Sequence, residues 1–192
     1  MLTWWRRLLA RRSKAGSAPS GDESQAAFTR PATWEDVVAT ARLLNREGAR
    51  YALVGGYALA AHGYVRMTED IDIAVAPDSE NALRWVAALA QLPDGAAREL
   101  AGEADPFEGD HLHAIRINDE YTVDVMPAVA GVAWAELEGH IEWLELNGER
   151  IPVLDLAGLL KTKQGLRPKD QQDAAIIRRA IARLAGDADH GS

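Results

Sequence analysis

Residues 51–75 decide the fold, and they read YALVGGYALAAHGYVRMTEDIDIAV. The stretch opens with a short apolar run typical of a buried strand and breaks at Gly55-Gly56. A helix-compatible segment follows over residues 57–61, and a second apolar run returns in which Asp70 and Asp72 alternate with isoleucines. Because successive side chains of a strand point to opposite faces, the isoleucines can enter a core while both acids project from the other face.

The two aspartates predict a metal site. Carboxylates held close on one face repel each other, and strands are depleted in Asp, so the arrangement costs stability unless a cation lies between them. A hard divalent cation, Mg²⁺ or Mn²⁺, is the usual partner of such oxygens.

The glycine pair predicts the other half of a site. Gly55 and Gly56 lack a β-carbon, so the backbone can turn sharply after the strand and a ligand can come close to the amides. If residues 57–61 are helical, those amides lie at a helix N-terminus, which favours phosphate. Glycines for phosphate and carboxylates for metal together indicate a nucleoside triphosphate site.

A third acid lies in the run YTVDVM, residues 121–126. Valines flank Asp124, so they can face one way while Asp124 joins the other two acids on a sheet face. The alternative is an aspartate on a solvated strand face, but the presence of the other two acids favours metal binding. Residues 111–117 and 121–126 surround a polar turn and predict a hairpin.

The remaining pattern indicates helices and one more hairpin. Thr33 begins a capped, apolar-periodic segment, and a final helix carries a core face. The expected helices cover 33–48, 80–92 and 156–160, a loop with one helical turn covers 93–110, and a hairpin joins 141–146 to 151–154 through Asn147-Gly148.

Composition fits one globular domain. A chain of 192 residues with 47% hydrophobic residues can bury a substantial core. Cysteine is absent, which excludes disulfides, zinc-thiolate sites and thiol nucleophiles and is compatible with a reducing cytoplasm. We expect a cytoplasmic protein with its domain over residues 31–187.

Charge is divided unevenly along the chain. Residues 1–30 carry a net charge of +4, so the total of −8 leaves −12 for the remainder. An acidic body repels long polyanions, which excludes broad nucleic-acid binding. We interpret 1–30 as a flexible basic tail, with a short interfacial helix as the alternative; its apolar run is too short for a transmembrane segment.

Four short motifs follow one another in the deciding stretch: Gly55-Gly56, His62-Gly63, Arg66-x-Thr68 and Asp70-x-Asp72. Their order and spacing are similar to those of the nucleotidyltransferase superfamily, which has the DNA polymerase β-like fold. The closest likeness is to the small bacterial branch of abortive-infection toxin, minimal and antibiotic-modifying nucleotidyltransferases.

The resemblance implies an α+β fold with a mixed β-sheet and flanking helices. It also implies that Asp70, Asp72 and Asp124 bind two Mg²⁺ or Mn²⁺ ions, which activate an acceptor hydroxyl and stabilise the pyrophosphate leaving group. The residues expected at the triphosphate of the NTP are Gly55, Gly56, Arg66, Thr68 and Lys163. Arg66 could instead pair with a neighbouring acid, and Thr68 could instead shape the strand. Asp170 and Asp173 are expected as helix-start or salt-bridge residues.

The expected activity is metal-dependent transfer of a nucleoside monophosphate from an NTP to an acceptor hydroxyl or phosphate. The acceptor stays open between an RNA end, a protein and a small molecule. The toxin-like resemblance adds a possible cognate antitoxin. The alternative is a nucleotide-binding regulatory or antitoxin-like module without turnover.

Overall fold

The computed structural model describes residues 29–65, 67–103, 105–107, 113–165 and 167–189, the last five of these by their backbone alone. Nearly all of the tail expected over residues 1–30 lies outside this range, as does Arg66. Within the described part, no helix is both long enough and apolar enough to cross a membrane.

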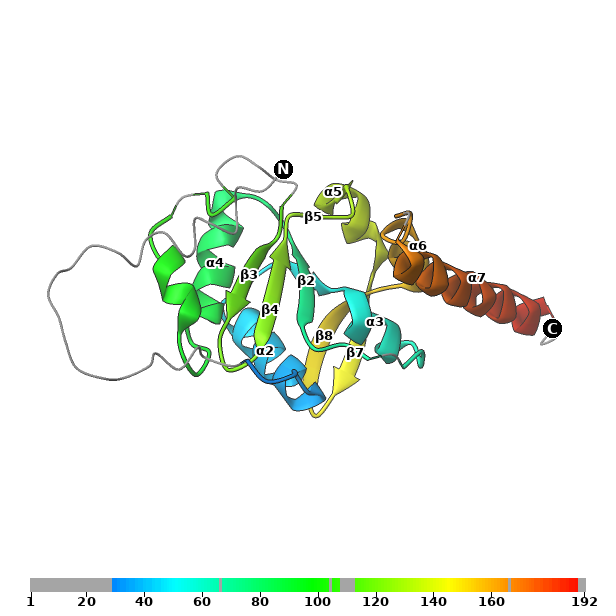
Figure 1. Ribbon diagram of the computed structural model, residues 1–192, viewed down its shortest axis with the longest axis horizontal. Coiled ribbons are helices and arrows are strands. Elements are labelled where there is room, and N and C mark those ends of the chain that lie inside the picture. The colour runs from blue at the N-terminus through cyan, green and yellow to red at the C-terminus, as the bar shows by residue number, and fades with distance from the viewer. Residues whose placement is uncertain (1–28, 66, 104, 108–112, 166, 190–192) are drawn as a thin grey trace, which may run out of the picture.

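A six-stranded sheet in the order β3-β4-β2-β1-β8-β7 forms the centre of the molecule (Figure 1). The β2/β4 and β1/β8 pairs are parallel and the others antiparallel, so the mixed sheet predicted above is confirmed. The strands are β1 (Tyr51–Leu53), β2 (Ile71–Val75), β3 (Ile115–Asn118), β4 (Thr122–Met126), β7 (Ile141–Leu146) and β8 (Glu149–Leu154). A separate two-stranded ribbon joins β5 (Ala128–Val129) to β6 (Val132–Ala133).

Both predicted hairpins are present. Strands β3 and β4 pair around Glu120, and β7 and β8 pair around Asn147-Gly148. Asn147 and Gly148 both have positive φ angles, as the tight turn requires. The second hairpin places β7 at the edge of the sheet.

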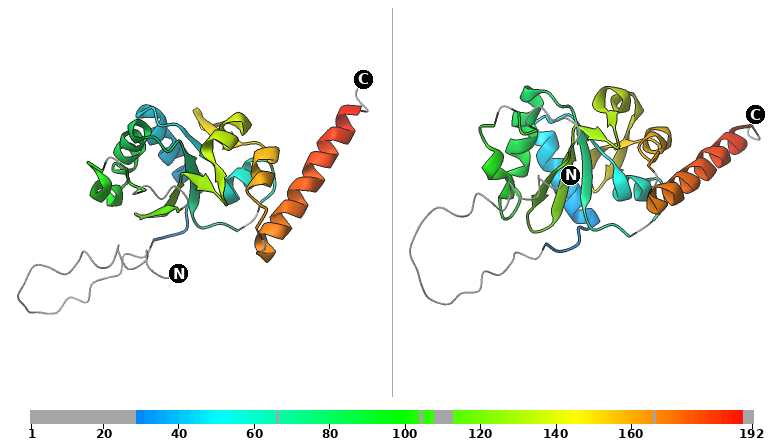
Figure 2. Two further views of the ribbon diagram at one scale, coloured as in Figure 1. Left: turned by 90° about the horizontal axis from the view of Figure 1, so that it is seen from above. Right: turned by 45° about the horizontal axis from the view of Figure 1, so that its top comes forward.

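Helices flank the sheet, which confirms the α+β class. Helices α2 and α4 pack against each other, as do α3 and α6. Figures 1 and 2 show α7 running out beyond the rest of the molecule. The helices are α2 (Trp34–Arg46), α3 (Gly55–Ala61), α4 (Ser79–Leu89), α5 (Trp134–Leu137), α6 (Leu156–Lys161) and α7 (Pro168–Asp189), with 3₁₀ turns η1 (Ala96–Leu100) and η2 (Glu138–His140).

The start of α2 shows why a local sequence signal was reliable. Thr33 and Asp36 form a reciprocal capping box, in which each side chain accepts a hydrogen bond from the other residue's backbone N–H. The Arg30 guanidinium donates to both Asp36 carboxylate oxygens, at 2.5 and 2.8 Å. This ion pair holds the pKa of Asp36 below its ordinary value.

The two faces of the central strands have different environments. Ile71, Ile73, Val123 and Val125 are at most 1% exposed and belong to the hydrophobic core. The alternating positions lie on the opposite face, where Asp72, Asp124 and Met126 are only partly buried, whereas Ala74 and Thr122 are buried. This face therefore carries the polar side chains of the candidate site.

Several boundaries differ from those expected, and two of them concern predicted site residues. Strand β2 begins at Ile71, so Asp70 precedes the strand instead of lying within it. Helix α3 begins at Gly55, two residues earlier than expected. Both differences concern the ends of elements, where tertiary contacts decide the last hydrogen bonds.

Candidate active site

Strand register brings the predicted acids together. In the parallel β2/β4 pair, Asp72 lies directly beside Asp124. Asp70 lies one residue before β2, at the same end of the strand. The pairing of β2 with β4 thus brings three carboxylates from distant parts of the sequence to one end of the sheet face, as the sequence analysis predicted.

Arg116, which the sequence analysis missed, lies among these carboxylates. It comes from β3, where it pairs with Asp124 in register. Its Nε donates to Asp124 Oδ1 at 2.9 Å and its Nη2 to Asp124 Oδ2 at 2.7 Å. The same Nη2 donates to Asp70 Oδ2 at 2.9 Å. One guanidinium nitrogen therefore bridges two of the three acids in charge-assisted hydrogen bonds.

A sequence signal for Arg116 did exist. A hairpin centred on Glu120 places position 116 opposite position 124, so the hairpin prediction, taken residue by residue, predicts the Arg116–Asp124 pair. The second bridge, to Asp70, had no such signal because it depends on how β2 and β4 pair.

The site couples burial and charge. The pKa of Asp70 is raised above its ordinary value. Burial is the largest cause and repulsion by Asp124 adds to it, while the charge of Arg116 acts in the opposite direction. Hydrogen bonding to Asp124 raises the pKa of Arg116, and the charges of Asp124, Asp70 and Asp72 raise it further. All three carboxylates therefore act on one permanently charged guanidinium.

Gly55 is required by the position of Asp72. Its φ is +64°, and a β-carbon built there would lie 2.0 Å from Asp72 Oδ2. The backbone also holds this approach, because the Val54 amide donates to the Asp72 carbonyl at 2.9 Å. Gly56 has a different neighbour, since its β-carbon would lie 2.5 Å from the Thr68 β-carbon. Close packing on Thr68 thus accounts for the second glycine.

A cavity of about 590 Å³ opens beside Gly55 and Asp72. Asp72 is the one of the three acids that lines it, and Thr162 and Met126 contribute to its wall. The lining also includes the cationic residues Lys163, Arg167 and Lys169. Three positive side chains thus line the same hollow as the carboxylates of Asp72 and Asp170.

Lys163, predicted at the triphosphate, is held by the acids of α7. Its Nζ lies 3.1 Å from Asp173 Oδ2 and 3.8 Å from Asp170 Oδ1. The Lys163 side chain is only 11% exposed, and that of Asp173 only 4%. The prediction that Asp170 and Asp173 serve as salt-bridge residues is confirmed.

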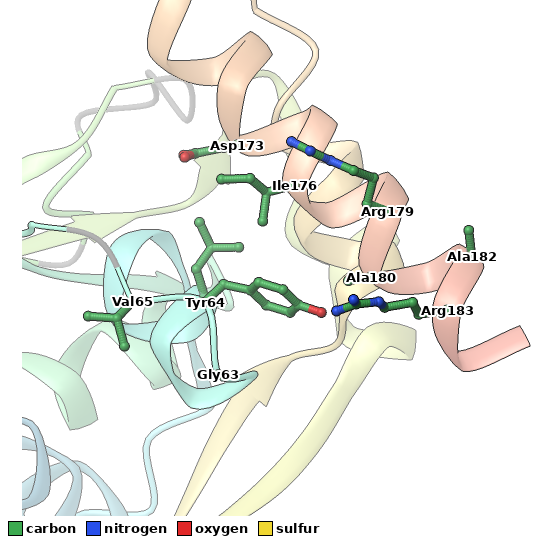
Figure 3. A pocket seen from close by; sticks show the side chains of 10 residues that line it. Gly63, Tyr64, Val65, Asp173, Ile176, Arg179, Ala180, Ala182 and Arg183 are labelled. Carbon is green, nitrogen blue, oxygen red and sulfur yellow. The ribbon is translucent and has the colours of Figure 1, made fainter. Parts of the chain in front are cut away.

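A second cavity, of about 790 Å³, lies between residues 63–65 and α7 (Figure 3). Figure 3 shows the Tyr64 hydroxyl and the Arg183 guanidinium pointing toward one another across it. Asp173 lines this cavity and pairs with Lys163, which lines the first. The Lys163–Asp173 ion pair therefore contributes one residue to the lining of each cavity.

The carboxylates suit a cation, although they do not form a closed metal site. Within the described ranges, no three acidic or histidine side chains converge closely enough to hold one as they stand. Oxygens of Asp70 and Asp124 nevertheless converge on a single cationic atom, Nη2 of Arg116, at 2.9 and 2.7 Å. The carboxylates therefore suit a cation, and the guanidinium takes the position where those two oxygens meet.

The sequence matches no protein-family model and no curated protein. Among solved structures, a protein assigned as a nucleotidyltransferase from Thermotoga maritima is similar, with 16% identity and a TM-score of 0.49. That match covers 84% of this chain and 99% of the other.

Two further structures are similar. The antibiotic-resistance factor ANT(2'')-Ia has 12% identity and a TM-score of 0.43, with 80% of this chain and 93% of its own covered. An antigenic nucleotidyltransferase-like protein from Paracoccidioides brasiliensis has 16% identity and a TM-score of 0.41, with 79% and 86% covered.

Proposed function

We propose that this protein is a nucleotidyltransferase, which moves a nucleoside monophosphate from an NTP to an acceptor and releases pyrophosphate. One observation carries the proposal: three carboxylates gather at one end of a sheet, beside a cavity lined by three cationic side chains. An NTP needs both charges, because its phosphates are anionic and its reactive phosphorus requires a cation held by carboxylates.

The cationic wall would bind the triphosphate. Lys163, Arg167 and Lys169 line the cavity, and ammonium and guanidinium groups donate charge-assisted hydrogen bonds to phosphate oxygens. Gly55 has no side chain to block the approach from the opposite wall. Thr68 and Gly56 pack on each other and are absent from the residues that line this cavity, so their contact with the nucleotide stays a prediction.

Asp70, Asp72 and Asp124 would hold a divalent cation, Mg²⁺ or Mn²⁺. When bound, such an ion lowers the pKa of an acceptor hydroxyl and neutralises charge on the departing pyrophosphate. The protein's part is to fix the carboxylates, which it does through the β2/β4 register and the close contact of Asp72 with Gly55. A second ion stays a prediction.

The net charge of the protein outside residues 1–30 limits the class of acceptor. A net charge of −12 outside residues 1–30 disfavours a long nucleic acid along the body, so a small molecule, a protein side chain or a single RNA end is the proposed acceptor. A toxin-like role with a cognate antitoxin stays a prediction.

Labelled NTPs test the proposal. The purified chain is incubated with Mg²⁺ or Mn²⁺ and each α-³²P-labelled NTP, with RNA, protein extract or small hydroxylated compounds offered as acceptors. We expect label to appear in one acceptor class and to be lost in Asp72→Asn. Asp94→Asn, an exposed acid away from the three carboxylates, is the matched control and should retain activity.

Each result has a distinct reading. Full transfer by Asp72→Asn would refute the assigned chemistry. NTP binding without product in any acceptor class would favour the alternative, a nucleotide-binding regulatory module.

A further inference from the structure

The guanidinium of Arg116 takes the place that a metal ion would take between two of the acids. Its Nη2 bridges Asp70 and Asp124, and its Nε and Nη2 together occupy both oxygens of Asp124. Asp124 therefore has no oxygen in this arrangement that is free of Arg116. A cation bound by all three carboxylates requires that these bonds break.

The arrangement belongs to the fold and is not a chance surface contact. Arg116 and Asp124 are cross-strand partners in register, so the β3/β4 hairpin places the two side chains on one face. The Asp124 side chain is only 15% exposed. The carboxylates of Asp70 and Asp124 are partly buried and contact the same nitrogen atom, so they would repel each other without a positive charge between them.

The Arg116 side chain can nevertheless move away from the carboxylates into solvent. Strand β3 is at the edge of the sheet, and the Arg116 side chain is 36% exposed. A long flexible side chain at an edge can turn its charged head to water while its strand stays paired. Asp70, with its side chain 33% exposed, is likewise open to solvent on this side.

We propose that Arg116 is the resident counter-cation of the carboxylate site, and that a divalent cation binds Asp70 and Asp124 only by displacing its guanidinium. This rests on the proposed function, because it takes those acids as metal ligands. A guanidinium and a divalent cation repel each other at contact distance, so the two exclude each other. In the metal-free protein, Arg116 offsets one of the two negative charges of Asp70 and Asp124, so free metal binds weakly; nucleotide-bound metal brings the additional attraction of the cationic cavity wall.

Metal binding without nucleotide tests the inference directly. Mn²⁺ is titrated into the full chain, and free Mn²⁺ is followed by electron paramagnetic resonance. Arg116→Gln removes the competing charge and should bind Mn²⁺ at least tenfold more tightly than the wild type. Arg84→Gln is the matched control, because Arg84 is 41% exposed and pairs with Glu80 on α4; its Mn²⁺ affinity should equal that of the wild type.

A second readout separates competition from a merely structural role. Thermal unfolding of Arg116→Gln should occur at a lower temperature than that of the wild type without metal and should recover when Mn²⁺ is added, whereas the wild type should change little. Arg116→Lys keeps a charge but cannot bridge both acids bidentately, so its Mn²⁺ affinity should lie between those of the wild type and Arg116→Gln. This variant keeps the test valid if the Gln variant does not fold.

Three results bear on the inference. A gain in Mn²⁺ affinity that disappears on adding Asp124→Asn supports it. Equal or weaker Mn²⁺ binding by Arg116→Gln and Arg116→Lys overturns it, even if the wild type transfers nucleotides normally. Absence of nucleotidyl transfer by the wild type counts against the proposed function and leaves the Mn²⁺ comparison unaffected.

Discussion

Replacing Gly55 with alanine should displace Asp72 and so connect backbone geometry to the site. Gly55 has a φ of +64°, and an alanine β-carbon would lie 2.0 Å from Asp72 Oδ2 and 2.8 Å from the Asp72 β-carbon. Rotation of the Asp72 side chain can relieve the first overlap. The second involves an atom attached to strand β2, so the chain itself must shift.

The magnitude follows from two contributions. An L-residue in the left-handed region costs roughly 1–2 kcal/mol, which the lower entropy of the unfolded chain offsets by about 0.4–1 kcal/mol. Overpacking adds about 1–3 kcal/mol. We therefore expect Gly55→Ala to lower the free energy of unfolding by about 1–5 kcal/mol.

Gly48→Ala is the matched control. Gly48 has a φ of +67°, but nothing lies within 4 Å of a β-carbon built there. It should show the backbone cost alone, about 1 kcal/mol, and full nucleotidyl transfer. Gly55→Ala should also lower the rate of nucleotidyl transfer by about 100-fold, because displacing the Asp72 carboxylate by about 1 Å misaligns the reacting groups.

Urea unfolding followed by tryptophan fluorescence measures the stability difference, and labelled-NTP transfer measures activity. Equal stability and equal activity of the two variants would refute the reasoning that Gly55 is needed by Asp72.

Three further perturbations test the surrounding fold by urea unfolding. Arg30 holds the pKa of Asp36 below its ordinary value of 3.8. The contribution of the Arg30–Asp36 ion pair to the free energy of unfolding is therefore complete above about pH 4 and is lost as the pH falls further. The stability gap between wild type and Asp36→Asn should narrow as the pH is lowered from about 6 to about 2; a constant gap would contradict this. Tyr121→Phe should cost about 1–2 kcal/mol, since it leaves the buried Thr40 hydroxyl without the partner 3.0 Å away, and no loss would contradict that bond. Leu44→Ala, at a position with 0% exposure, should cost about 2–5 kcal/mol, and a loss below about 1 kcal/mol would place Leu44 outside the core.

Local patterns in the sequence predicted most of the elements and all three acids. The capping box at Thr33 and the Asn147-Gly148 turn are signals read from a few neighbouring residues, and both are confirmed. Alternation along a strand likewise predicted that Asp72 and Asp124 would leave the core face. Such features depend on the conformation of one short segment, which the residues of that segment determine.

Long-range contacts were beyond the sequence pattern. Residues 72 and 124 meet because β2 and β4 are parallel neighbours, and no local periodicity encodes which strands pair. The bond from Arg116 to Asp70 was beyond the pattern for a related reason: it exists only once three strands lie side by side.

The sequence by itself determined which residues carry charge and which face of each segment they occupy. The tertiary structure alone decided their partners. It placed Arg116 between two carboxylates, Lys163 against Asp173, and Gly55 against Asp72. The physical reason is that backbone preferences act over a few residues, whereas an electrostatic site is made by groups that chain folding brings together from distant positions.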